Sequence, residues 1–443
     1  MRKFSARSTA LPLIVMMCLA GSAAKSDDWP QFLGLHRNGV SAETGLISEW
    51  PASGPKIAWR TSLGVSMSGV AVANDSAYTM FQDDSDQYVV CLNATDGKEH
   101  WRTPVAPMYE NGMGNGPRAT PTVVDGKVFA FTGEGILVAL KADDGKLLWS
   151  VDVPKLLSGK PNEYGVSCSP LVTKDHVIVH SGTKTAAVAA FGIADGKLAW
   201  KAGRGNAGYS SPVMMKLGGK DQIVSLTAAG AIGLEPASGT ELWSFPFPTE
   251  YDCNTASPLY LDGEHVLISA SYLFSMSLCS LFMYLDGEHV LISAGENHGS
   301  VIIKVKPDPQ GGKAESVWST LGKDSQLRAE WQTPVIHDGY LYGLDNSGSA
   351  GPITNLVCIR LEDHKTMWQK NRFGKSNLIL ADGKLFLTTM AGEVVIVEAS
   401  PKEFHELGRA TVMETTRQAP AIANGHLLVR DDKEVVCIDV RHP

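Results

Sequence analysis

Short runs of alternating apolar and polar residues, separated by turn sequences, fill residues 119–149. A period of two is what a β-strand shows when alternate side chains face opposite sides of a sheet. Three such runs are Thr120–Val124, Lys127–Thr132 and Leu137–Lys141. A fourth begins at Leu147 and carries Trp149. Because Asp125-Gly126 and Asp144-Gly145 favour tight turns, the pattern predicts a four-stranded antiparallel sheet.

The end of this unit, Asp-Gly-Lys-x-x-Trp, recurs along the chain. Close copies are Asp96-Gly97-Lys98 with Trp101 and Asp195-Gly196-Lys197 with Trp200. Together with weaker copies, the anchoring tryptophans are Trp59, Trp101, Trp149, Trp200, Trp243, Trp318 and Trp368. Their spacings are 42, 48, 51, 43, 75 and 50 residues. Such a period is typical of propellers and solenoids.

The spacing of 75 residues has its own cause. The string YLDGEHVLISA occurs at Tyr260–Ala270 and again at Tyr284–Ala294, an offset of 24 residues. Without one copy the spacing becomes 51 residues, so we interpret a 24-residue duplication within residues 260–294 as surplus. It is either a recent tandem duplication or a fault of sequence assembly. The alternative is an insertion that touches a membrane, because the segment between the copies is apolar but too short to span a bilayer.

Eight innermost strands are expected, many of them opened by Ser-Pro or Thr-Pro. They are Gly69–Ala73, Thr120–Val124, Ser169–Val172, Ser211–Met215, Ser257–Tyr260, Thr333–Ile336, Asn377–Leu380 and Ala419–Ala423. A strand of the fourth, outermost kind at residues 58–63 precedes the first inner strand. The last blade, which ends at Val440, has no fourth strand after it. In the last copy of the repeat, Leu407 replaces the tryptophan. The sequence therefore predicts an all-β, eight-bladed propeller whose N-terminal strand completes the last blade and removes the open sheet edges.

The repeat resembles the pyrroloquinoline-quinone-type (PQQ-like) repeat over residues 58–440, with its Gly-Lys-x-x-Trp ending. The outer-membrane assembly lipoproteins share that repeat. The absence of a Trp-Asp dipeptide disfavours a WD40 propeller. The resemblance implies that the seven tryptophans dock each outer strand against the neighbouring blade.

The segment before the propeller also carries a resemblance. Its DWPQFLGLHRNG sequence is similar to the leader of secreted propellers of planctomycete-type bacteria, with Phe32 and Leu35 as departures. We expect residues 25–57 to pack as an arm on the propeller rim, because a terminal segment must be tied down to stay ordered.

Residues 1–24 have the three parts of a secretory signal: basic residues, an apolar run and small residues before a cleavage site. Removal of Arg2, Lys3 and Arg7 with this segment changes the net charge from −8 to −11. We therefore expect an exported, periplasmic or extracellular protein without a lipid anchor or transmembrane segment. A nucleic-acid partner is disfavoured by the charge, and we expect a monomer.

Conventional catalytic and metal-binding motifs are missing. Cys91, Cys358 and Cys437 occupy a repeat position filled elsewhere by small residues, and no cysteine spacing implies a disulfide framework. His176 and His180 are about 13 Å apart if they lie on one strand, too far to share a metal ion. We predict that both face solvent. No catalytic residue and no metal ligand is assigned.

Propellers bind ligands in the central funnel, at the loops that lead into the inner strands and between the second and third strands. Candidate binding residues in these loops are Arg118, Tyr164, Tyr209, Asn254, Glu296, Asn297, His298, Glu330, Trp331, Asp345, Asn346 and Arg417. An Arg118–Glu296 ion pair with a structural role is the alternative for that pair.

Two functions are compatible with these residues. The preferred hypothesis is a non-catalytic binding or scaffold protein of the bacterial cell envelope, with a protein or glycan partner and no cofactor. The alternative implied by the resemblance is a quinoprotein oxidoreductase of the alcohol or sugar dehydrogenase kind, with PQQ and calcium as cofactors. There Glu and Asn would hold calcium, Arg would neutralise the quinone carboxylates and Trp331 would stack on the ring. The absence of two adjacent cysteines disfavours this alternative.

Overall fold

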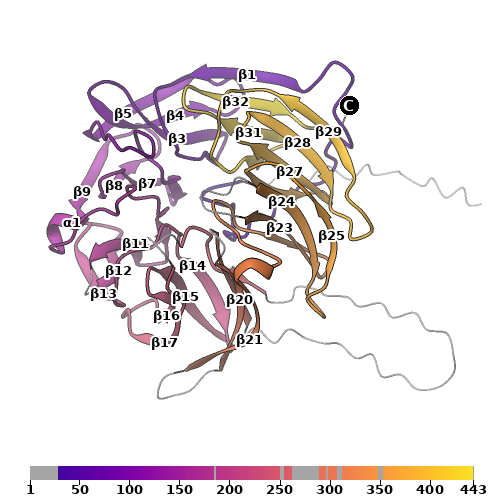
Figure 1. Ribbon diagram of the computed structural model, residues 1–443. Coiled ribbons are helices and arrows are strands. Elements are labelled where there is room, and N and C mark those ends of the chain that lie inside the picture. Colours follow the sequence, from indigo (N-terminus) through magenta and orange to yellow (C-terminus); the bar gives the residue numbers. More distant parts are fainter. Residues whose placement is uncertain are drawn as a thin grey trace, which may run out of the picture.

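The computed structural model describes residues 28–183, 186–249, 254–261, 289–295, 298–306, 312–347 and 353–442. They form eight four-stranded antiparallel sheets arranged in a ring, so the predicted eight-bladed propeller is confirmed (Figure 1). The predicted signal segment, residues 1–24, lies outside the described residues, as does most of the duplicated region, residues 262–288.

The blades are numbered here along the chain, each from its innermost to its outermost strand. Blades 1 to 4 comprise β2 (Ala71–Ala73), β3 (Ser76–Gln82), β4 (Asp86–Asn93), β5 (Glu99–Pro107); β6 (Thr122–Val124), β7 (Lys127–Phe131), β8 (Ile136–Lys141), β9 (Leu147–Asp152); β10 (Leu171–Val172), β11 (His176–Thr183), β12 (Ala186–Gly192), β13 (Leu198–Ala202); β14 (Val213–Leu217), β15 (Lys220–Thr227), β16 (Gly230–Leu234), β17 (Glu241–Pro246).

Blades 5 to 8 comprise β18 (Leu259–Tyr260), β19 (His289–Ala294), β20 (Gly299–Lys306), β21 (Lys313–Leu321); β22 (Val335–His337), β23 (Tyr340–Ser347), β24 (Ile353–Arg360), β25 (Thr366–Lys370); β26 (Ser376–Ala381), β27 (Lys384–Thr389), β28 (Glu393–Glu398), β29 (Glu406–Thr411); β30 (Ala421–Ala423), β31 (His426–Arg430), β32 (Glu434–Asp439), β1 (Lys56–Ser62). In blade 5 the inner strand β18 ends at Tyr260, the first residue of the first copy of the duplicated string, whereas β19 comes from the second copy.

Helix is confined to α1 (Val153–Leu156) and the 3-10 turn η2 (Gly322–Asp324) in the described residues. Neither has the length or the apolar character to cross a bilayer.

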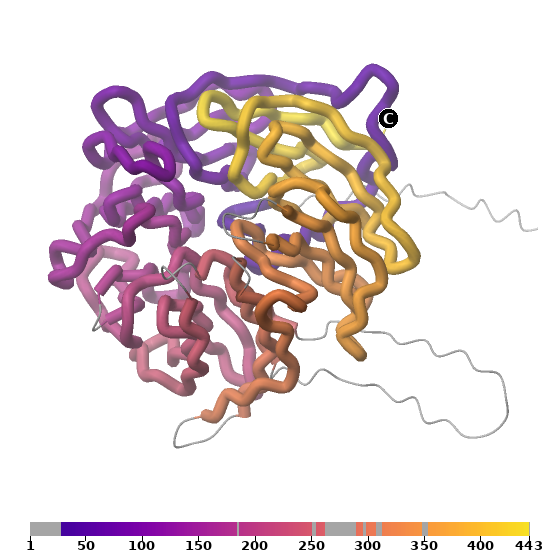
Figure 2. Tube along the Cα trace, viewed as in Figure 1, coloured from indigo at the N-terminus to yellow at the C-terminus, as the bar shows by residue number. Residues whose placement is uncertain are grey.

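The ring is closed by the N-terminal strand, as predicted. Strand β1 pairs antiparallel with β32, with Trp59 opposite Cys437, and Figure 2 shows the indigo start of the chain beside the yellow end. Lys56 Nζ lies 2.8 Å from Asp439 Oδ2, and Arg60 Nη1 lies 2.5 Å from Glu434 Oε1. The outermost strand of the last blade is therefore supplied from the opposite end of the sequence.

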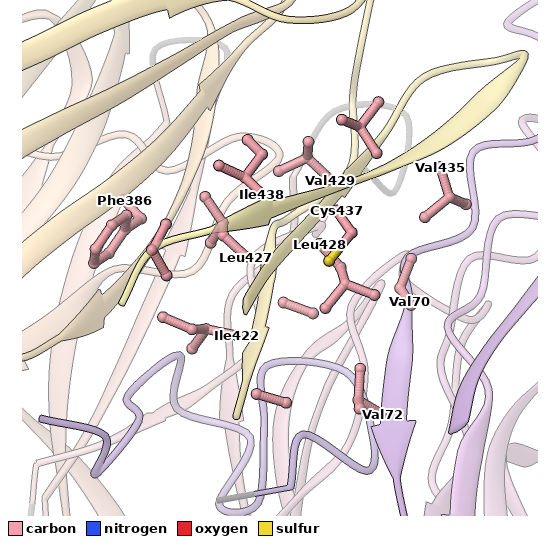
Figure 3. Packing of buried hydrophobic residues seen from close by; sticks show 14 of the residues in the cluster. Val70, Val72, Phe386, Ile422, Leu427, Leu428, Val429, Val435, Cys437 and Ile438 are labelled. Carbon is pink, nitrogen blue, oxygen red and sulfur yellow. The ribbon is translucent and has the colours of Figure 1, made fainter. Parts of the chain in front are cut away.

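The hydrophobic core lies between neighbouring blades rather than at one centre. The largest buried cluster joins blades 7, 8 and 1 at the closing seam, and each of the other clusters combines side chains from two adjacent sheets. Figure 3 shows that seam, with Phe386 on one side, Leu427 and Ile438 in the middle, and Val72 on the other. Closure of the ring buries these side chains because each sheet covers the next.

The repeated tryptophans and glycines are partners across blade boundaries. Trp149 on β9 donates its indole Nε1–H to the Ile193 carbonyl of blade 3, at 3.0 Å. Its ring also covers Gly196, where an added Cβ would lie 2.7 Å from the ring. The same arrangement joins Trp59 to Gly97, Trp101 to Gly145 and Trp200 to Gly239. The Gly and Trp of one repeat thus contact different neighbours, which links blade 8 to blade 1 and continues through blades 2 and 3 to blade 4.

Three tryptophan positions depart from this pattern. Trp243 donates to Gln222 Oε1 within its own blade, and Trp318 stacks on His364 of blade 6. In blade 7 the register places Gly408, and not Leu407, opposite Ile396. Trp50 packs over Gly408 and donates to the Val394 carbonyl at 3.3 Å. The arm therefore contributes a tryptophan to the blade whose own repeat lacks one.

The small residue of the repeat lies directly opposite the tryptophan. Cys91 pairs with Trp101 and Cys358 pairs with Trp368 in the strand registers. In blade 4 this position is Gly233, where an added Cβ would lie 2.1 Å from the Trp243 ring. Both cysteines are buried and unpaired, in agreement with their predicted role as small apolar residues.

The Ser/Thr-Pro sequences before the inner strands form a chain of hydrogen bonds around the channel. The backbone N–H of Thr120 donates to Ser169 Oγ, that of Ser169 to Ser211 Oγ, that of Ser211 to Ser257 Oγ, and that of Ser257 to Thr333 Oγ1, at 2.9–3.1 Å. Five consecutive blades are joined in this way. Seven of the eight inner strands begin two residues later than the sequence predicts, whereas β26 begins one residue earlier, at Ser376.

The described part of the arm runs through the channel before it reaches the outer strands. Trp29 exchanges backbone hydrogen bonds with Val72 of β2, and the Arg37 guanidinium donates to the carbonyls of Ser169 and Pro170 at 2.8 Å. Val40 then bridges to Leu380 of β26. This central course, visible as the indigo tube in the middle of the ring (Figure 2), differs from the rim position that the sequence predicts. Apolar Trp29 and Leu33 are buried there because the inner strands surround them.

His180 is buried, which contradicts its predicted exposure to solvent. Its side chain points from β11 toward blade 4 because the two sheets pack face to face. Nδ1–H donates to the Gly208 carbonyl at 3.2 Å, so Nε2 of the neutral ring accepts from Ser225 Oγ at 2.6 Å. Burial lowers the pKa of His180 to about 4.

This histidine predicts a loss of stability between pH 6.5 and pH 4. Because the folded pKa is below the unfolded value, the unfolded chain binds the proton first and stability falls as the pH falls, by about 3 kcal/mol for this group. Denaturant unfolding at several pH values measures the slope. His180→Gln should flatten it, whereas substitution of the exposed His100 to Gln should not; equal slopes in all three proteins would contradict the assignment.

Candidate functional site

A cavity of about 940 Å³ opens at the end of the channel where the inner strands begin. It is lined by loops from all eight blades and by Phe32 of the arm. The lining residues are Phe32, Met67, Gly69, Met113, Arg118, Thr120, Tyr164, Ser167, Tyr209, Ser211, Thr249, Thr255, Gly295, His298, Glu330, Trp331, Lys375, Asn377, Met390, Arg417, Gln418 and Ala419. Because the arm lies against the inner strands, we take Phe32 to form the floor of this funnel.

The loop between β5 and β6 shapes one wall of the funnel. Arg118 donates from Nη1 to the Gly116 carbonyl at 2.5 Å and from Nη2 to the Gly114 carbonyl at 2.6 Å. Its guanidinium also lies 5.1 Å from the centroid of the Tyr109 ring. Burial lowers the pKa of Arg118, and the nearby charge of Arg417 lowers it further. Two positive charges therefore lie close together in this wall.

A row of alternating charged and aromatic side chains forms the next part of the wall. Arg417 donates to the Met113 carbonyl at 2.7 Å and lies 5.5 Å from the centroid of the Trp331 ring. Lys375 Nζ lies 4.0 Å from that centroid and 3.0 Å from Glu330 Oε1. These cation–π and ionic contacts hold Trp331, which is only half-buried, in a fixed place at the cavity.

The remaining walls are aromatic and polar. Tyr164 stacks on Tyr209 with 5.7 Å between ring centroids, and His298 meets the ring of Phe247 edge-on at 4.5 Å. Thr249 and Thr255 each present a buried hydroxyl without a hydrogen-bond partner among the described residues. The funnel thus offers both ring surfaces and polar atoms to a ligand.

Seven of the twelve residues predicted for the funnel line it. These are Arg118, Tyr164, Tyr209, His298, Glu330, Trp331 and Arg417. Glu296 and Asn297 lie outside the described residues, and with them the proposed Arg118–Glu296 ion pair.

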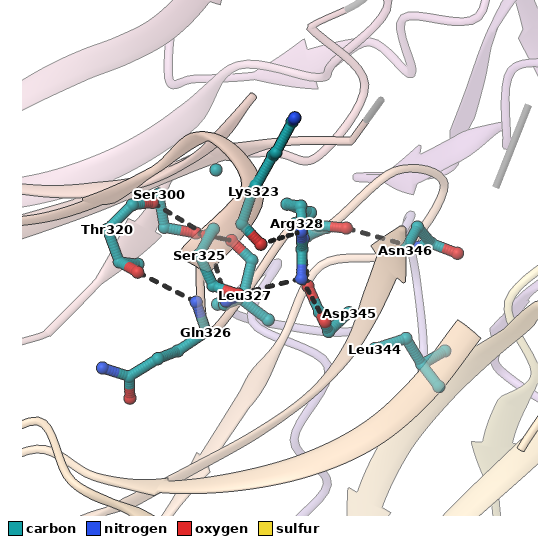
Figure 4. Close-up of polar contacts among 12 residues, drawn as sticks. Ser300, Thr320, Lys323, Ser325, Gln326, Leu327, Arg328, Leu344, Asp345 and Asn346 are labelled. Carbon is teal, nitrogen blue, oxygen red and sulfur yellow. Dashed lines mark hydrogen bonds and ion pairs between the residues drawn. The ribbon is translucent and has the colours of Figure 1, made fainter. Parts of the chain in front are cut away.

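Three predicted residues do not line the funnel. Asn254 is buried and donates from Nδ2 to the Thr227 carbonyl at 2.7 Å, which ties the loop to blade 4. Asp345 pairs with Arg328, whose Nε and Nη2 lie 2.6 and 2.7 Å from its two carboxylate oxygens (Figure 4). Asn346 donates to the Arg328 carbonyl at 3.1 Å. The reason is that β23 extends through Ser347, so Asp345 and Asn346 belong to the sheet rather than to a loop.

Several residues that line the funnel were not among the predicted binding residues. Lys375 lies two residues before the predicted inner strand that starts at Asn377, as Arg417 lies two residues before the one that starts at Ala419. This shared repeat position could have identified Lys375. Met67 and Met113 have no comparable signal, because nothing in a methionine separates a funnel wall from a core. Phe32 could not be assigned because the arm was expected on the rim.

Comparisons with known proteins support the repeat type. A family model described as outer membrane protein assembly factor BamB matches residues 85–276. BamB of Yersinia pestis is 22% identical over 371 residues, which cover 82% of this chain and 84% of that protein. The dehydrogenase subunit of a quinone alcohol dehydrogenase from Gluconacetobacter polyoxogenes is 39% identical over 83 residues, 17% of this chain and 11% of that subunit.

Solved structures share the fold. Quinohemoprotein alcohol dehydrogenase from Comamonas testosteroni matches with a TM-score of 0.65 at 13% identity, covering 96% of this chain and 82% of that one. BamB from Moraxella catarrhalis matches with a TM-score of 0.54 at 13% identity, covering 86% and 98%. The chain is therefore a β-propeller with a PQQ-type repeat. Within that class it is similar in sequence to BamB, and it shares its fold with BamB and with quinohemoprotein alcohol dehydrogenases.

Proposed function

We propose that this protein is a non-catalytic binding or scaffold protein of the bacterial cell envelope that holds a partner in its central funnel. The observation that carries the proposal is the funnel wall itself, in which Trp331 is fixed between Lys375 and Arg417 beside the cavity. A half-exposed aromatic ring that cations already hold in place can contact a ligand at low entropic cost, because its side chain is ordered before binding. Envelope location rests on the expected signal segment and on the similarity to BamB, a protein described as an outer membrane protein assembly factor.

The quinoprotein alternative fits the described lining less well. A calcium ion needs several oxygen ligands, and Glu330, the carboxylate of the described lining, already pairs with Lys375. Moreover, Lys375 lies over the ring of Trp331, where a quinone would have to stack. Of the charged lining residues, only Arg118 and Arg417 suit a quinone, because they can pair with its carboxylates. The described residues therefore do not provide the oxygen ligands that the calcium ion of such a site needs.

Partner capture tests the proposal. We expect Trp331→Ala to reduce the recovery of cross-linked envelope proteins at least tenfold, because an aromatic anchor in a pocket carries much of the affinity. The melting temperature should stay nearly unchanged, since Trp331 lies in a loop and in none of the buried hydrophobic clusters between blades. Quantitative mass spectrometry of the cross-linked material, after purification from the native envelope, gives the recovery.

A matched control separates the funnel from the rim. Val317 on β21 is about half exposed, and Val317→Ser should leave recovery at the wild-type level. If Val317→Ser lowers recovery and Trp331→Ala does not, the partner binds elsewhere. The visible absorbance spectrum of the same preparation decides the alternative, because a stoichiometric bound quinone would replace the binding function with the quinoprotein one.

A further inference from the structure

Two guanidinium groups share one loop at the mouth of the funnel. Arg118 is anchored by the carbonyls of Gly114 and Gly116, and Arg417, which reaches in from blade 8, is anchored by the carbonyl of Met113. Each guanidinium has five N–H groups, so these bonds leave donors to spare on both side chains among the described residues. Neutral carbonyls hold both guanidinium groups in place. Asp432 lies near enough to Arg417 to interact with its charge, whereas the hydrogen bonds of Arg118 go to neutral carbonyls.

The described lining of the funnel has a net charge opposite in sign to that of the whole protein. This lining holds three cations, Arg118, Arg417 and Lys375, and one carboxylate, Glu330. The protein as a whole carries a net charge of −8. Such a positive hollow in an acidic molecule draws acidic groups to one place, because the rest of the surface repels them.

The loops of blades 5 and 6 present buried polar atoms that have no hydrogen-bond partner among the described residues. Glu330 is 8% exposed, and while its Oε1 faces Lys375, its Oε2 has no hydrogen-bond partner among the described residues. The hydroxyls of Thr249 and Thr255 are in the same state and line the same cavity. A buried acceptor is costly unless a ligand supplies a donor. The ligand that suits these loops must therefore carry N–H or O–H groups in addition to negative charge.

The apolar part of the wall is adaptable. Met67, Met113 and Met390 line the cavity, and flexible thioether side chains accommodate apolar groups of different shapes. The volume of about 940 Å³ is near the upper end of the range of small-molecule pockets, so a segment of chain can enter. Methionine surfaces suit the side chains of a peptide better than the hydroxyl-covered rings of a glycan.

We propose that the funnel binds an acidic, extended peptide segment of a partner protein. Its carboxylates pair with Arg118 and Arg417, its apolar side chains contact the methionines, and its backbone N–H groups donate to Glu330 Oε2 and the threonine hydroxyls. This inference rests on the proposed binding function and names the chemistry of the partner.

Fluorescence anisotropy with short labelled peptides tests the inference on the full chain. The probe is an acetylated hexapeptide of alternating Asp and Leu, and its comparison is the same peptide with Asn in place of Asp. We expect saturable binding of the acidic peptide, at least tenfold tighter than that of the neutral one. Raising NaCl from about 50 to about 500 mM should weaken it, because salt screens exposed charges.

Variants locate the site. Arg417→Gln should raise the dissociation constant of the acidic peptide at least tenfold, the change expected from loss of one charge-assisted contact. Arg360→Gln is the matched control, since Arg360 forms an exposed ion pair with Asp363 on blade 6, and it should change binding less than twofold. Because Arg118→Gln also releases the loop at residues 114–116, Arg118→Lys is measured beside it and should keep part of the affinity.

The outcomes separate the two proposals. Equal binding of acidic and neutral peptides, no effect of Arg417→Gln, or tighter binding of an oligoguluronate of matched charge would overturn the acidic-peptide inference. If partner capture still depends on Trp331 in those cases, the proposed binding function stands and only its ligand class is wrong. If neither capture nor peptide binding depends on funnel residues, both proposals fail.

Discussion

Deletion of Ile57–Leu63 is expected to abolish cooperative folding. These residues form most of β1, which completes blade 8 by pairing with β32. Without them β32 becomes an exposed edge strand with unpaired backbone groups, and the Trp59 contact with the Gly97 turn of blade 1 is lost. Thermal unfolding followed by circular dichroism, with size-exclusion chromatography for aggregation, measures the result.

A linker variant separates lost pairing from a shortened connection. Replacing residues 57–63 by an equally long Gly-Ser sequence keeps the arm joined to blade 1 but removes the strand-forming side chains. We expect this protein to lose the cooperative transition as the deletion does. A soluble monomer with an unchanged melting transition, from either variant, would refute closure of the ring by this strand.

Most of the fold was predictable because each blade repeats the same local rules. Alternating apolar residues, Asp-Gly turns and a tryptophan at a near-constant spacing gave the number of blades, and the unmatched strand at residues 58–63 gave the closure. The strand starts were less predictable. The Ser and Thr residues before proline form hydrogen bonds between blades, so they precede the inner strands instead of belonging to them.

The course of the arm could not be predicted from its own sequence. Trp29 and Arg37 are buried inside the channel only because the inner strands of several blades surround them. Arg37 illustrates the difficulty, since its partners are backbone carbonyls of Ser169 and Pro170, more than 130 residues away. A local pattern shows that such residues need partners, but not which blade supplies them.

The funnel was partly predictable for a related reason. Loops before inner strands point to the channel, which correctly placed Arg118, Trp331 and Arg417 at the cavity. The same rule failed for Asp345, because assigning this residue to a loop requires knowing where β23 ends. Strand ends are the least certain feature of a sequence pattern. Whether the residues that line the cavity bind a partner stays a prediction.

Trp149→Ala is expected to lower the free energy of unfolding by about 3–5 kcal/mol, the usual cost of removing a buried aromatic ring. Trp149 is 9% exposed, donates to blade 3 and covers the Gly196 turn. The loss includes the contact surface between blades 2 and 3, and the Ile193 carbonyl is left without its donor. Denaturant unfolding monitored by far-UV circular dichroism measures it; a loss below about 1 kcal/mol would show that the ring contributes little to the junction.

Glycine substitutions test whether the ring and the turn act as partners. Gly196 and Gly126 have nearly the same backbone φ, +66° and +69°, but an added Cβ at Gly196 meets the Trp149 ring, whereas at Gly126 nothing lies within 4 Å. Gly126→Ala should therefore cost about 1 kcal/mol from backbone strain alone. Gly196→Ala should cost about 1–3 kcal/mol more, because the ring must move. In the Trp149→Ala background this extra cost should disappear, and strictly additive losses would show that Gly196 is required by its backbone conformation and not by the tryptophan of the preceding blade.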